Sequence, residues 1–458
     1  MRDLNQIIKA YDVRGIYPDQ LDADLARAIG VAFVHVVAAS TRDGGPGVVV
    51  IGHDMRPSGP ELVAAFADGV MSQGCDVIEI GLASTDGLYF ASGHLDLPGA
   101  MFTASHNPAE YNGIKLCRPG AAPVGQETGL GQIKQMLIDG WVSDYSGPRG
   151  KTTSQDLVSD YAAYLRKLVD LSDIRPLKVV VDAGNGMGGF TVPKVLNGLP
   201  LEIIPMYFEL DGSFPNHEAN PIDPENLRDL QAAVLKHSAD LGLAFDGDAD
   251  RCFVVDELGQ IVSPSVLTAL IAHRELIKHP GSTIIHNLIT SRTVQEVVAE
   301  NGGVAVRTRV GHSYIKATMA ETNAVFGGEH SGHFYFRDFW RADSGMLAAL
   351  HAMAALGETA EGVTFSDLLK TYMRYTESGE INSRVENVTE VVAKIKATYG
   401  SQTGVTVDEL DGLTFSGSDW WFNVRASNTE PLLRLNVETK TPEHTKQLVD
   451  AVLAIIRG

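Results

Sequence analysis

The strongest constraint on the fold of this chain is a strand-and-helix pattern that begins again twice along the sequence. Short apolar runs typical of buried strands alternate with stretches whose apolar residues recur at helical spacing. Strands that alternate with helices indicate βαβ units and a mostly parallel sheet. A polar segment at residues 141–156, which we interpret as a linker, separates the first run from the second, and a third run begins near residue 263. The expected strands lie at residues 48–52, 76–80, 99–102, 178–182, 201–205, 241–245 and 282–286.

The C-terminal part follows a different pattern. Residues 420–425 and 433–437 alternate between apolar and polar side chains, as strands of a half-exposed sheet do, and a helix is expected over residues 442–456. This pattern favours a smaller α+β domain. Because 458 residues are too many for a single hydrophobic core, we expect three or four domains in all.

Charge and cysteine content exclude several classes of function. The formal net charge is −20, from 37 basic and 57 acidic residues, which argues against non-specific binding to nucleic acid or to an anionic membrane. The three cysteines, Cys75, Cys117 and Cys252, are scattered and form no CxxC motif, so a reducing compartment is expected. No apolar run reaches the ~18 residues that span a bilayer. We therefore predict a cytoplasmic protein without nucleic-acid or membrane partners.

The stretch TASHNP at residues 103–108 follows an expected buried strand directly. Proline restricts its own backbone and that of the preceding residue, so Asn107 and Pro108 predict a tight turn. A serine on such a turn, Ser105, is placed where a nucleophile or a phosphate carrier belongs in an open α/β sheet. The alternative is an ordinary Asn-Pro turn with a solvated serine.

A second stretch, DGDADR at residues 246–251, also follows an expected strand. Alternate residues of an extended chain point to the same side, so Asp246, Asp248 and Asp250 are expected to converge. Three convergent carboxylates favour a hard cation such as Mg²⁺. A calcium EF-hand is the rival, with Glu257 at its twelfth position, but Arg251 stands where that loop needs glycine. A solvated acidic turn is the remaining alternative.

Three further loops carry polar groups or glycines in patterns that suggest ligands. GEHSGH at 328–333 offers groups that bind sugar hydroxyls, and RASNTEP at 425–431 could form an anion cradle, although either could be a plain polar loop. The glycine-rich AGNGMGG at 183–189 is either a tight strand-to-helix turn or a phosphate cradle. Together, the serine, the metal loop, the sugar loop and the anion cradle are the set that phosphoryl transfer requires.

Five motifs in this order resemble the α-D-phosphohexomutase family, and within it the bacterial phosphomannomutase/phosphoglucomutase group. The motifs are YDVRG at 11–15, TASHNPAEYNGIK at 103–115, DGDADR, GEHSGH and RASNTEP. The resemblance implies three related βαβ-rich α/β domains with mixed sheets and a smaller C-terminal α+β domain around a central cleft. The expected divisions are residues 1–150, 151–254, 255–366 and 367–458.

The resemblance also implies a role for each motif residue. Ser105 would be the phosphoserine, and one of its phosphate oxygens would join Asp246, Asp248 and Asp250 in binding Mg²⁺. Acid–base help would come from Lys115 or His333. The residues implied to line the reacting phosphate are Arg14, His106, Lys115 and His333. Those implied to bind or support the substrate are Arg251, Gly311, His312, Glu329, Ser331, Arg425, Ser427, Asn428 and Thr429.

The implied reaction converts a hexose 1-phosphate into the 6-phosphate reversibly, through a bound glucose or mannose 1,6-bisphosphate. Because residues 328–345 look most like the phosphomannomutase branch, we expect mannose phosphate first and glucose phosphate as well. A main activity as a phosphoglucomutase, a metal-dependent sugar-phosphate phosphatase and a non-catalytic sugar-phosphate sensor are the alternatives. The partner is a hexose phosphate, and the chain is expected to be a monomer or dimer.

One departure from the family pattern is visible. The family pattern that the chain resembles has a Lys-Cys-Thr stretch after the expected strand at residues 282–286. This chain has Leu288, Ile289 and Thr290 at that place. The resemblance therefore implies no cationic phosphate contact from residues 288–290, and Arg292 is the cation nearest to them in the sequence.

Overall fold

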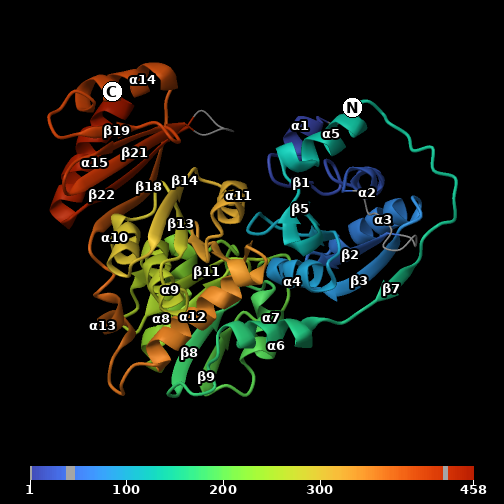
Figure 1. The fold of residues 1–458 in the computed structure, drawn as a ribbon, viewed down its shortest axis with the longest axis horizontal. Helices are drawn as coiled ribbons and strands as arrows, with labels where there is room; N and C mark the ends of the chain where they lie inside the picture. Colours follow the sequence, from blue (N-terminus) through green and yellow to red (C-terminus); the bar gives the residue numbers. More distant parts are fainter. Residues whose placement is uncertain (1–2, 38–46, 427–431) are drawn as a thin grey trace. The chain divides into compact units, whose positions relative to one another are not determined.

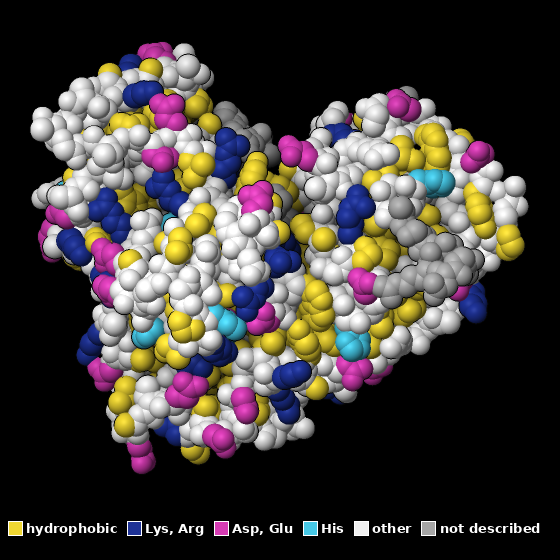
Figure 2. Space-filling model, viewed as in Figure 1, with side chains coloured by type: hydrophobic (Ala, Val, Ile, Leu, Met, Phe, Trp, Pro, Cys, Tyr) yellow, Lys and Arg dark blue, Asp and Glu magenta, His cyan; other side chains and the backbone are white. Residues whose placement is uncertain are grey.

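The computed structural model describes residues 3–37, 47–426 and 432–458, and the chain forms two compact units (Figure 1). Unit 1 comprises Met1–Ser263 and Ser331–Ser366, and unit 2 comprises Pro264–His330 and Asp367–Gly458. No described helix combines the length and the apolar character that crossing a bilayer requires. On the face drawn in Figure 2, acidic and basic side chains are interspersed rather than gathered into separate regions.

The first sheet of unit 1 has seven strands in the order β1-β5-β4-β2-β3-β7, with β6 paired to β5. Its central strand β2 runs parallel to β3 and β4, whereas β5 is antiparallel to β4 and β1, so the sheet is mixed. The continuous apolar run of β2 suits a strand covered on both faces, and helices α3 and α4 both pack against it. The strands are β1 (Val13–Ile16), β2 (Val48–His53), β3 (Asp76–Leu82), β4 (Gly99–Phe102), β5 (Tyr111–Arg118), β6 (Ala122–Pro123) and β7 (Thr152–Ser154). The helices are α1 (Leu4–Ile7), α2 (Ala23–Val37), α3 (Gly59–Met71), α4 (Thr85–Leu95) and α5 (Leu130–Ile138).

The second sheet of unit 1 has the order β12-β11-β10-β8-β9. Strands β9, β8 and β10 are parallel, and β11 and β12 continue the sheet antiparallel. Strands β16 and β17 of unit 1 pair with each other antiparallel and precede helix α12. The strands are β8 (Leu177–Asp182), β9 (Leu201–Met206), β10 (Leu241–Phe245), β11 (Cys252–Asp256), β12 (Ile261–Val262), β16 (Phe334–Phe336) and β17 (Ala342–Asp343). The helices are α6 (Val158–Leu168), α7 (Gly188–Leu196), α8 (Arg228–His237) and α12 (Gly345–Gly357).

Unit 2 contains two kinds of sheet. Strand β13 lies between β14 and β15, all parallel, whereas the C-terminal sheet is antiparallel in the order β18-β22-β21-β20-β19. The strands are β13 (Thr283–Asn287), β14 (Val304–Thr308), β15 (Phe326–Gly328), β18 (Thr376–Arg384), β19 (Thr406–Asp408), β20 (Leu413–Ser416), β21 (Trp420–Ala426) and β22 (Leu432–Thr439). The helices are α9 (Pro264–Lys278), α10 (Arg292–Glu300), α11 (His312–Thr322), α14 (Val388–Tyr399) and α15 (Pro442–Arg457), and α13 (Phe365–Leu369) lies where the chain passes between units.

The expected α/β class is confirmed, with mixed sheets and a C-terminal α+β part. The segment interpreted as a linker, residues 141–156, also contains the short strand β7, which pairs parallel with β3. One local expectation was wrong. The alternation of apolar and polar residues predicts that one face of the C-terminal sheet is exposed. Most residues of β21 and β22 are instead buried. Helix α15 packs on β22, and Trp421 of β21 packs against Leu288 and Ile289, so apolar contacts cover positions expected to face water.

Candidate active site

Ser105 lies in the loop after β4, in a backbone conformation that L-residues seldom adopt. Its φ is 49°, in the left-handed region. The Ser105 amide donates to Thr103 Oγ1 at 2.9 Å, and its hydroxyl donates to Asp246 Oδ2 at 2.7 Å. The expected serine turn is therefore present, but Ser105 is buried against an acidic side chain rather than solvated.

The acidic loop after β10 brings Asp246, Asp248 and Asp250 together. One oxygen from each carboxylate lies within 4.8 Å of the others. The sequence predicted that an extended chain would bring the three carboxylates together, and this was wrong. The loop instead turns, with the Ala249 amide donating to the Asp246 carbonyl at 3.0 Å and with φ of 58° at Ala249.

The serine loop and the acidic loop touch through their backbones. A Cβ on Gly247 would lie 2.4 Å from the Ser105 carbonyl oxygen, so this approach requires glycine. Behind the acidic loop, the Met187 amide donates to the Gly247 carbonyl at 2.8 Å, and a Cβ on Gly186 would lie 2.6 Å from that oxygen. The glycine-rich 183–189 segment is therefore a tight turn that supports the acidic loop.

Helix α4 supports the acidic loop through its first residue, a contact that the sequence analysis missed. The Thr85 amide donates to the Asp248 carbonyl at 2.9 Å, and Thr85 Oγ1 donates to Asp248 Oδ2 at 2.7 Å. The start of α12 also packs on this loop, because a Cβ on Gly345 would lie 2.6 Å from the Arg251 carbonyl oxygen. The N-terminus of a helix carries partial positive charge and favours nearby carboxylates. The serine and threonine at positions 84 and 85, shortly after β3, were the available signal for such a helix start.

Two cationic side chains pair with the carboxylates. Lys115 Nζ lies 2.7 Å from Asp248 Oδ2 and 2.6 Å from Asp250 Oδ2, and Arg251 Nε lies 2.9 Å from Asp246 Oδ2. Burial disfavours the Lys115 ammonium, but the two carboxylates outweigh it and raise the pKa of Lys115 well above its usual value. Lys115 is therefore an ammonium ion in this arrangement.

The three carboxyl groups differ in their tendency to ionise. Burial raises the pKa of Asp246 to about 7, and the charges of Asp248 and Asp250 add to this rise although Arg251 opposes it. Burial also opposes ionisation of Asp248 and Asp250, but Lys115 holds the pKa of both below the usual value. Asp246 is thus the member of the triad that titrates near neutral pH.

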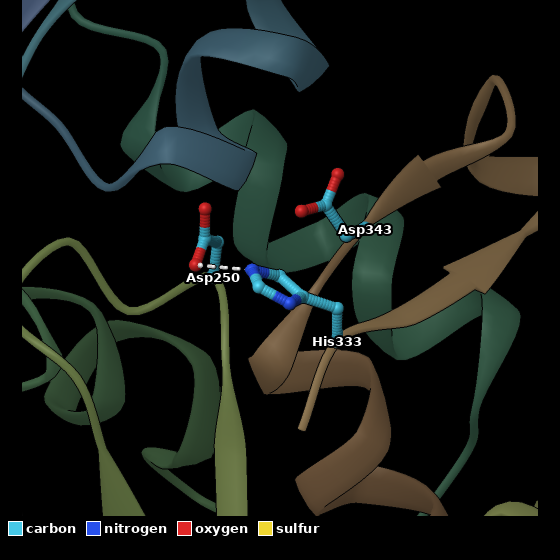
Figure 3. A group of neighbouring side chains, drawn as sticks. All are labelled: Asp250, His333 and Asp343. Carbon is cyan, nitrogen blue, oxygen red and sulfur yellow. Dashed lines mark ion pairs between the residues drawn. The ribbon is translucent and has the colours of Figure 1, made fainter. Parts of the chain in front are cut away.

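His333 lies beside the triad in unit 1. Its Nε2 is 3.5 Å from Asp250 Oδ1, with the Asp343 carboxylate close by (Figure 3). Ser331, expected to bind sugar, has its hydroxyl 2.9 Å from His333 Nδ1. Burial disfavours the charged imidazole, but the hydrogen bond and charge of Asp250, followed by the charge of Asp343, raise the pKa of His333.

His106 and Arg14 complete the group on the serine loop. His106 Nδ1 lies 3.2 Å from Ser105 Oγ and accepts from Arg251. Burial first, and then Arg251 and Arg14, lower the pKa of His106 to about 2, so its imidazole is neutral. Arg14 donates to Asn107 Oδ1 and pairs with Asp12. The structure therefore brings together all expected residues of unit 1, from Arg14 to His333.

The remaining expected residues belong to unit 2. Glu329 is buried, and its Oε1 accepts from the Gly311 amide at 3.2 Å and from Asn287 Nδ2 at 3.4 Å. Arg425 is the second-last residue of β21, and its guanidinium lies 3.4 Å from the Glu380 carboxylate and 3.6 Å from that of Asp411. Ser427, Asn428 and Thr429 lie outside the described residues, as does the side chain of His312.

The departure at residues 288–290 has a packing explanation. Leu288 and Ile289 are buried against Trp421. The guanidinium of Arg292, the nearest candidate to replace the expected cation, donates instead to three backbone carbonyls, those of Gly417, Ser418 and Trp420. This segment instead joins the β13–β15 part of unit 2 to its C-terminal sheet.

Four domain families of one enzyme class match the chain. The α/β/α domains I, II and III of phosphoglucomutase/phosphomannomutase match residues 5–137, 159–259 and 263–375, and the C-terminal domain matches residues 380–455. These four in succession define a phosphohexomutase, an isomerase that moves a phosphoryl group within a hexose phosphate. The chain belongs to the phosphoglucomutase/phosphomannomutase family.

Individual relatives agree with this assignment. The chain is 43% identical over 437 residues to the phosphohexose mutases of Xanthomonas campestris and 38% identical over 443 residues to the phosphomannomutase of Escherichia coli K12, covering 94% of each chain in both comparisons. The crystal structure of a phosphoglucomutase/phosphomannomutase family protein from Burkholderia thailandensis has a TM-score of 0.88 and 34% identity, covering 100% of this chain and 98% of that one.

Proposed function

We propose that this chain interconverts mannose 1-phosphate and mannose 6-phosphate and also acts on glucose phosphates. The observation that carries the proposal is the 2.7 Å contact between the Ser105 hydroxyl and Asp246 within a buried carboxylate triad. A serine in that place can hold a phosphoryl group beside a cation. Relatives named phosphomannomutase, at 35–38% identity, support mannose as the first sugar.

The residues around Ser105 fit a divalent cation. Three buried carboxylates supply the hard oxygen ligands that Mg²⁺ prefers, and the buried Asp248 Oδ1 has no hydrogen-bond partner among the described residues. Asp246, Asp248, Asp250 and an oxygen of phosphorylated Ser105 would hold the ion. When bound, it would neutralise charge on the transferring phosphoryl group.

Within this proposal the other residues of unit 1 have distinct tasks. Arg14 and Arg251 stabilise charge on the phosphoryl group as it leaves or returns to Ser105, and neutral His106 lines the same place. Lys115 adds positive charge, since Asp248 and Asp250 keep it protonated. We assign the exchange of the sugar-hydroxyl proton to His333, because an imidazole can take up and release a proton near neutral pH.

We assign recognition of the sugar to Glu329 with Ser331, and recognition of the non-transferring phosphate to Arg425, Ser427, Asn428 and Thr429, with Gly311 and His312 in support. In the first transfer, phosphorylated Ser105 gives its phosphoryl group to the free hydroxyl of the sugar monophosphate, and a bound glucose or mannose 1,6-bisphosphate forms. After the bisphosphate turns over in the site, its other phosphoryl group returns to Ser105 and the isomeric monophosphate is released.

Intact mass spectrometry tests the phosphoserine directly. After phosphatase treatment and then incubation with glucose 1,6-bisphosphate and Mg²⁺, the wild-type chain is expected to gain ~80 Da, the mass of one phosphoryl group. The Ser105→Ala variant should gain nothing and should lose mutase activity. Ser84→Ala is a matched control, since Ser84 is another buried serine of unit 1 but donates to Asp86. An unmodified wild-type chain would contradict the proposal.

Paired assays test the substrate and the reaction class. Rates with mannose 1-phosphate and glucose 1-phosphate are measured with coupled detection of each 6-phosphate. A glucose rate tenfold above the mannose rate would make phosphoglucomutase the main activity. Release of one inorganic phosphate per sugar would identify a phosphatase instead.

Four broader expectations remain part of the proposal. We divide the chain into domains at residues 1–150, 151–254, 255–366 and 367–458, the same number of parts as the family matches, although the matches for domains II and III end at residues 259 and 375. We also propose a cytoplasmic location, which the three free, buried cysteines support, a monomer or dimer, and a hexose phosphate as the partner.

A further inference from the structure

Arg56 is a buried arginine whose guanidinium is surrounded by the serine loop. It follows β2 in a charged loop, yet only 1% of the residue is exposed. Nη1 donates to the carbonyls of Pro108 and Tyr111, both at 2.8 Å. Nη2 donates to the carbonyls of Ser105 at 3.0 Å and Asn107 at 2.7 Å. One side chain therefore binds four backbone carbonyls between residues 105 and 111.

The guanidinium is itself held in place from two sides. Its Nε lies 3.3 Å from Asp54 Oδ2, and the Arg56 amide donates to Asp54 Oδ1 at 2.9 Å. The Phe214 ring covers the guanidinium, with its centroid 5.2 Å from Arg56 Cζ. A planar cation fixed in this way presents its donors in one geometry, which a flexible ammonium cannot do.

The contact with Ser105 is the one that bears on chemistry. The left-handed backbone of Ser105 is unfavourable for an L-residue and persists only where its surroundings fix it. Here the Ser105 amide is bound by Thr103, its hydroxyl by Asp246 and its carbonyl by Arg56. Of these three anchors, Arg56 alone also binds the rest of the loop. Loss of the Arg56 guanidinium therefore removes the hydrogen bond to the Ser105 carbonyl together with those to three other carbonyls of the loop.

We propose that Arg56 is a positioning residue for phosphoryl transfer, which holds Ser105 in its left-handed conformation so that the hydroxyl faces the carboxylate triad. The proposal rests on the proposed phosphoserine function. Arg56 touches backbone carbonyls, so its effect passes through the placement of Ser105. Misplacement of a reacting group by ~1 Å can cost about 100-fold in rate.

The test uses the full-length chain with Arg56→Lys, Arg56→Met and a matched control, Arg166→Met. Lysine keeps a positive charge beside Asp54 but cannot bind four carbonyls in one plane. Arg166 likewise donates to three backbone carbonyls, at the end of helix α7, and has no contact with the serine loop. For each variant we measure the melting temperature, kcat and KM, and the rate of the ~80 Da gain from glucose 1,6-bisphosphate.

We expect Arg56→Met to lower kcat and the phosphorylation rate of Ser105 together by about 100-fold, with KM changed less than about threefold. Arg56→Lys should fold, and its kcat and phosphorylation rate should lie between those of the wild type and those of Arg56→Met. Arg166→Met should lower the melting temperature while leaving both rates near wild type. Wild-type rates in folded Arg56→Lys would overturn the proposal, as would equal rate losses in the Arg166 control. A wild-type chain that never gains ~80 Da would instead overturn the proposed function, so the two failures are distinguishable.

Discussion

The affinity of the triad for Mg²⁺ should depend on pH through Asp246. Burial raises the pKa of this carboxyl to about 7, whereas Lys115 keeps Asp248 and Asp250 ionised. A protonated Asp246 must lose its proton before it can act as an anionic ligand, so binding of the cation releases a proton near neutral pH.

The size of the effect follows from the fraction of Asp246 that is ionised. With a pKa of about 7, that fraction is roughly 0.9 at pH 8 and roughly 0.1 at pH 6. The dissociation constant for Mg²⁺ should therefore be about tenfold larger at pH 6, which is about 1.4 kcal/mol of binding free energy.

The sign of the stability effect follows from the same carboxyl. The pKa of Asp246 is raised from its ordinary value of 3.8 to about 7 in the folded, metal-free chain. The folded state therefore binds this proton more tightly than the unfolded state does, and this adds to the free energy of unfolding. The contribution is fully present below pH 3.8 and is lost as pH rises through about 7. Added Mg²⁺ should then raise the melting temperature more at pH 8 than at pH 6.

Calorimetric titration of the EDTA-treated chain with Mg²⁺ at pH 6, 7 and 8 measures the dissociation constants. Asp246→Asn should bind more weakly at every pH and show less pH dependence than wild type. Asp450→Asn, which removes an exposed carboxylate paired with Lys446, should retain the wild-type profile. Dissociation constants that agree within twofold at pH 6 and pH 8 in the wild-type chain would refute the reasoning.

Three further outcomes are expected. Gly247→Ala places a Cβ 2.4 Å from the Ser105 carbonyl oxygen and should lower kcat at least about 100-fold, measured in the coupled assay. Thr85→Val removes a buried donor to Asp248 and should destabilise the chain by about 2 kcal/mol in urea unfolding while weakening Mg²⁺ binding. Arg292→Met leaves three backbone carbonyls at and just before the start of β21 without their donor and should increase proteolysis of unit 2, with Ser105 phosphorylated at the wild-type rate.

The sequence predicts the parallel strands well because they are short apolar runs between helices. Strand β4 was expected at its observed bounds, and β2, β3 and β8 within two residues of theirs. The antiparallel strand β5 was missed, because its residues NGIK belong to a polar motif. The edge strand β7 was also missed, since its TTS residues are exposed and carry no apolar signal.

The sequence predicted those parts of the candidate site whose residues lie within a single short stretch, as Ser105 and the acidic triad do. The supporting contacts were not, because they join segments far apart in the sequence. Arg56 is separated from Ser105 by 49 residues, and Thr85 from Asp248 by 163. Nothing in a single sequence distinguishes these residues from ordinary loop and helix-start residues, since only the fold determines what they touch.

Ser105, the triad and His333 belong to unit 1, whereas Glu329 and Arg425 belong to unit 2. Under the proposed function, this division separates the residues assigned to phosphoryl transfer from most of those assigned to recognition. Mutations that alter the choice of sugar would then accumulate in unit 2 while the residues assigned to phosphoryl transfer stay unchanged. Grafting unit 2 segments from relatives with other sugars offers a direct route to redesigned specificity on an unchanged reaction.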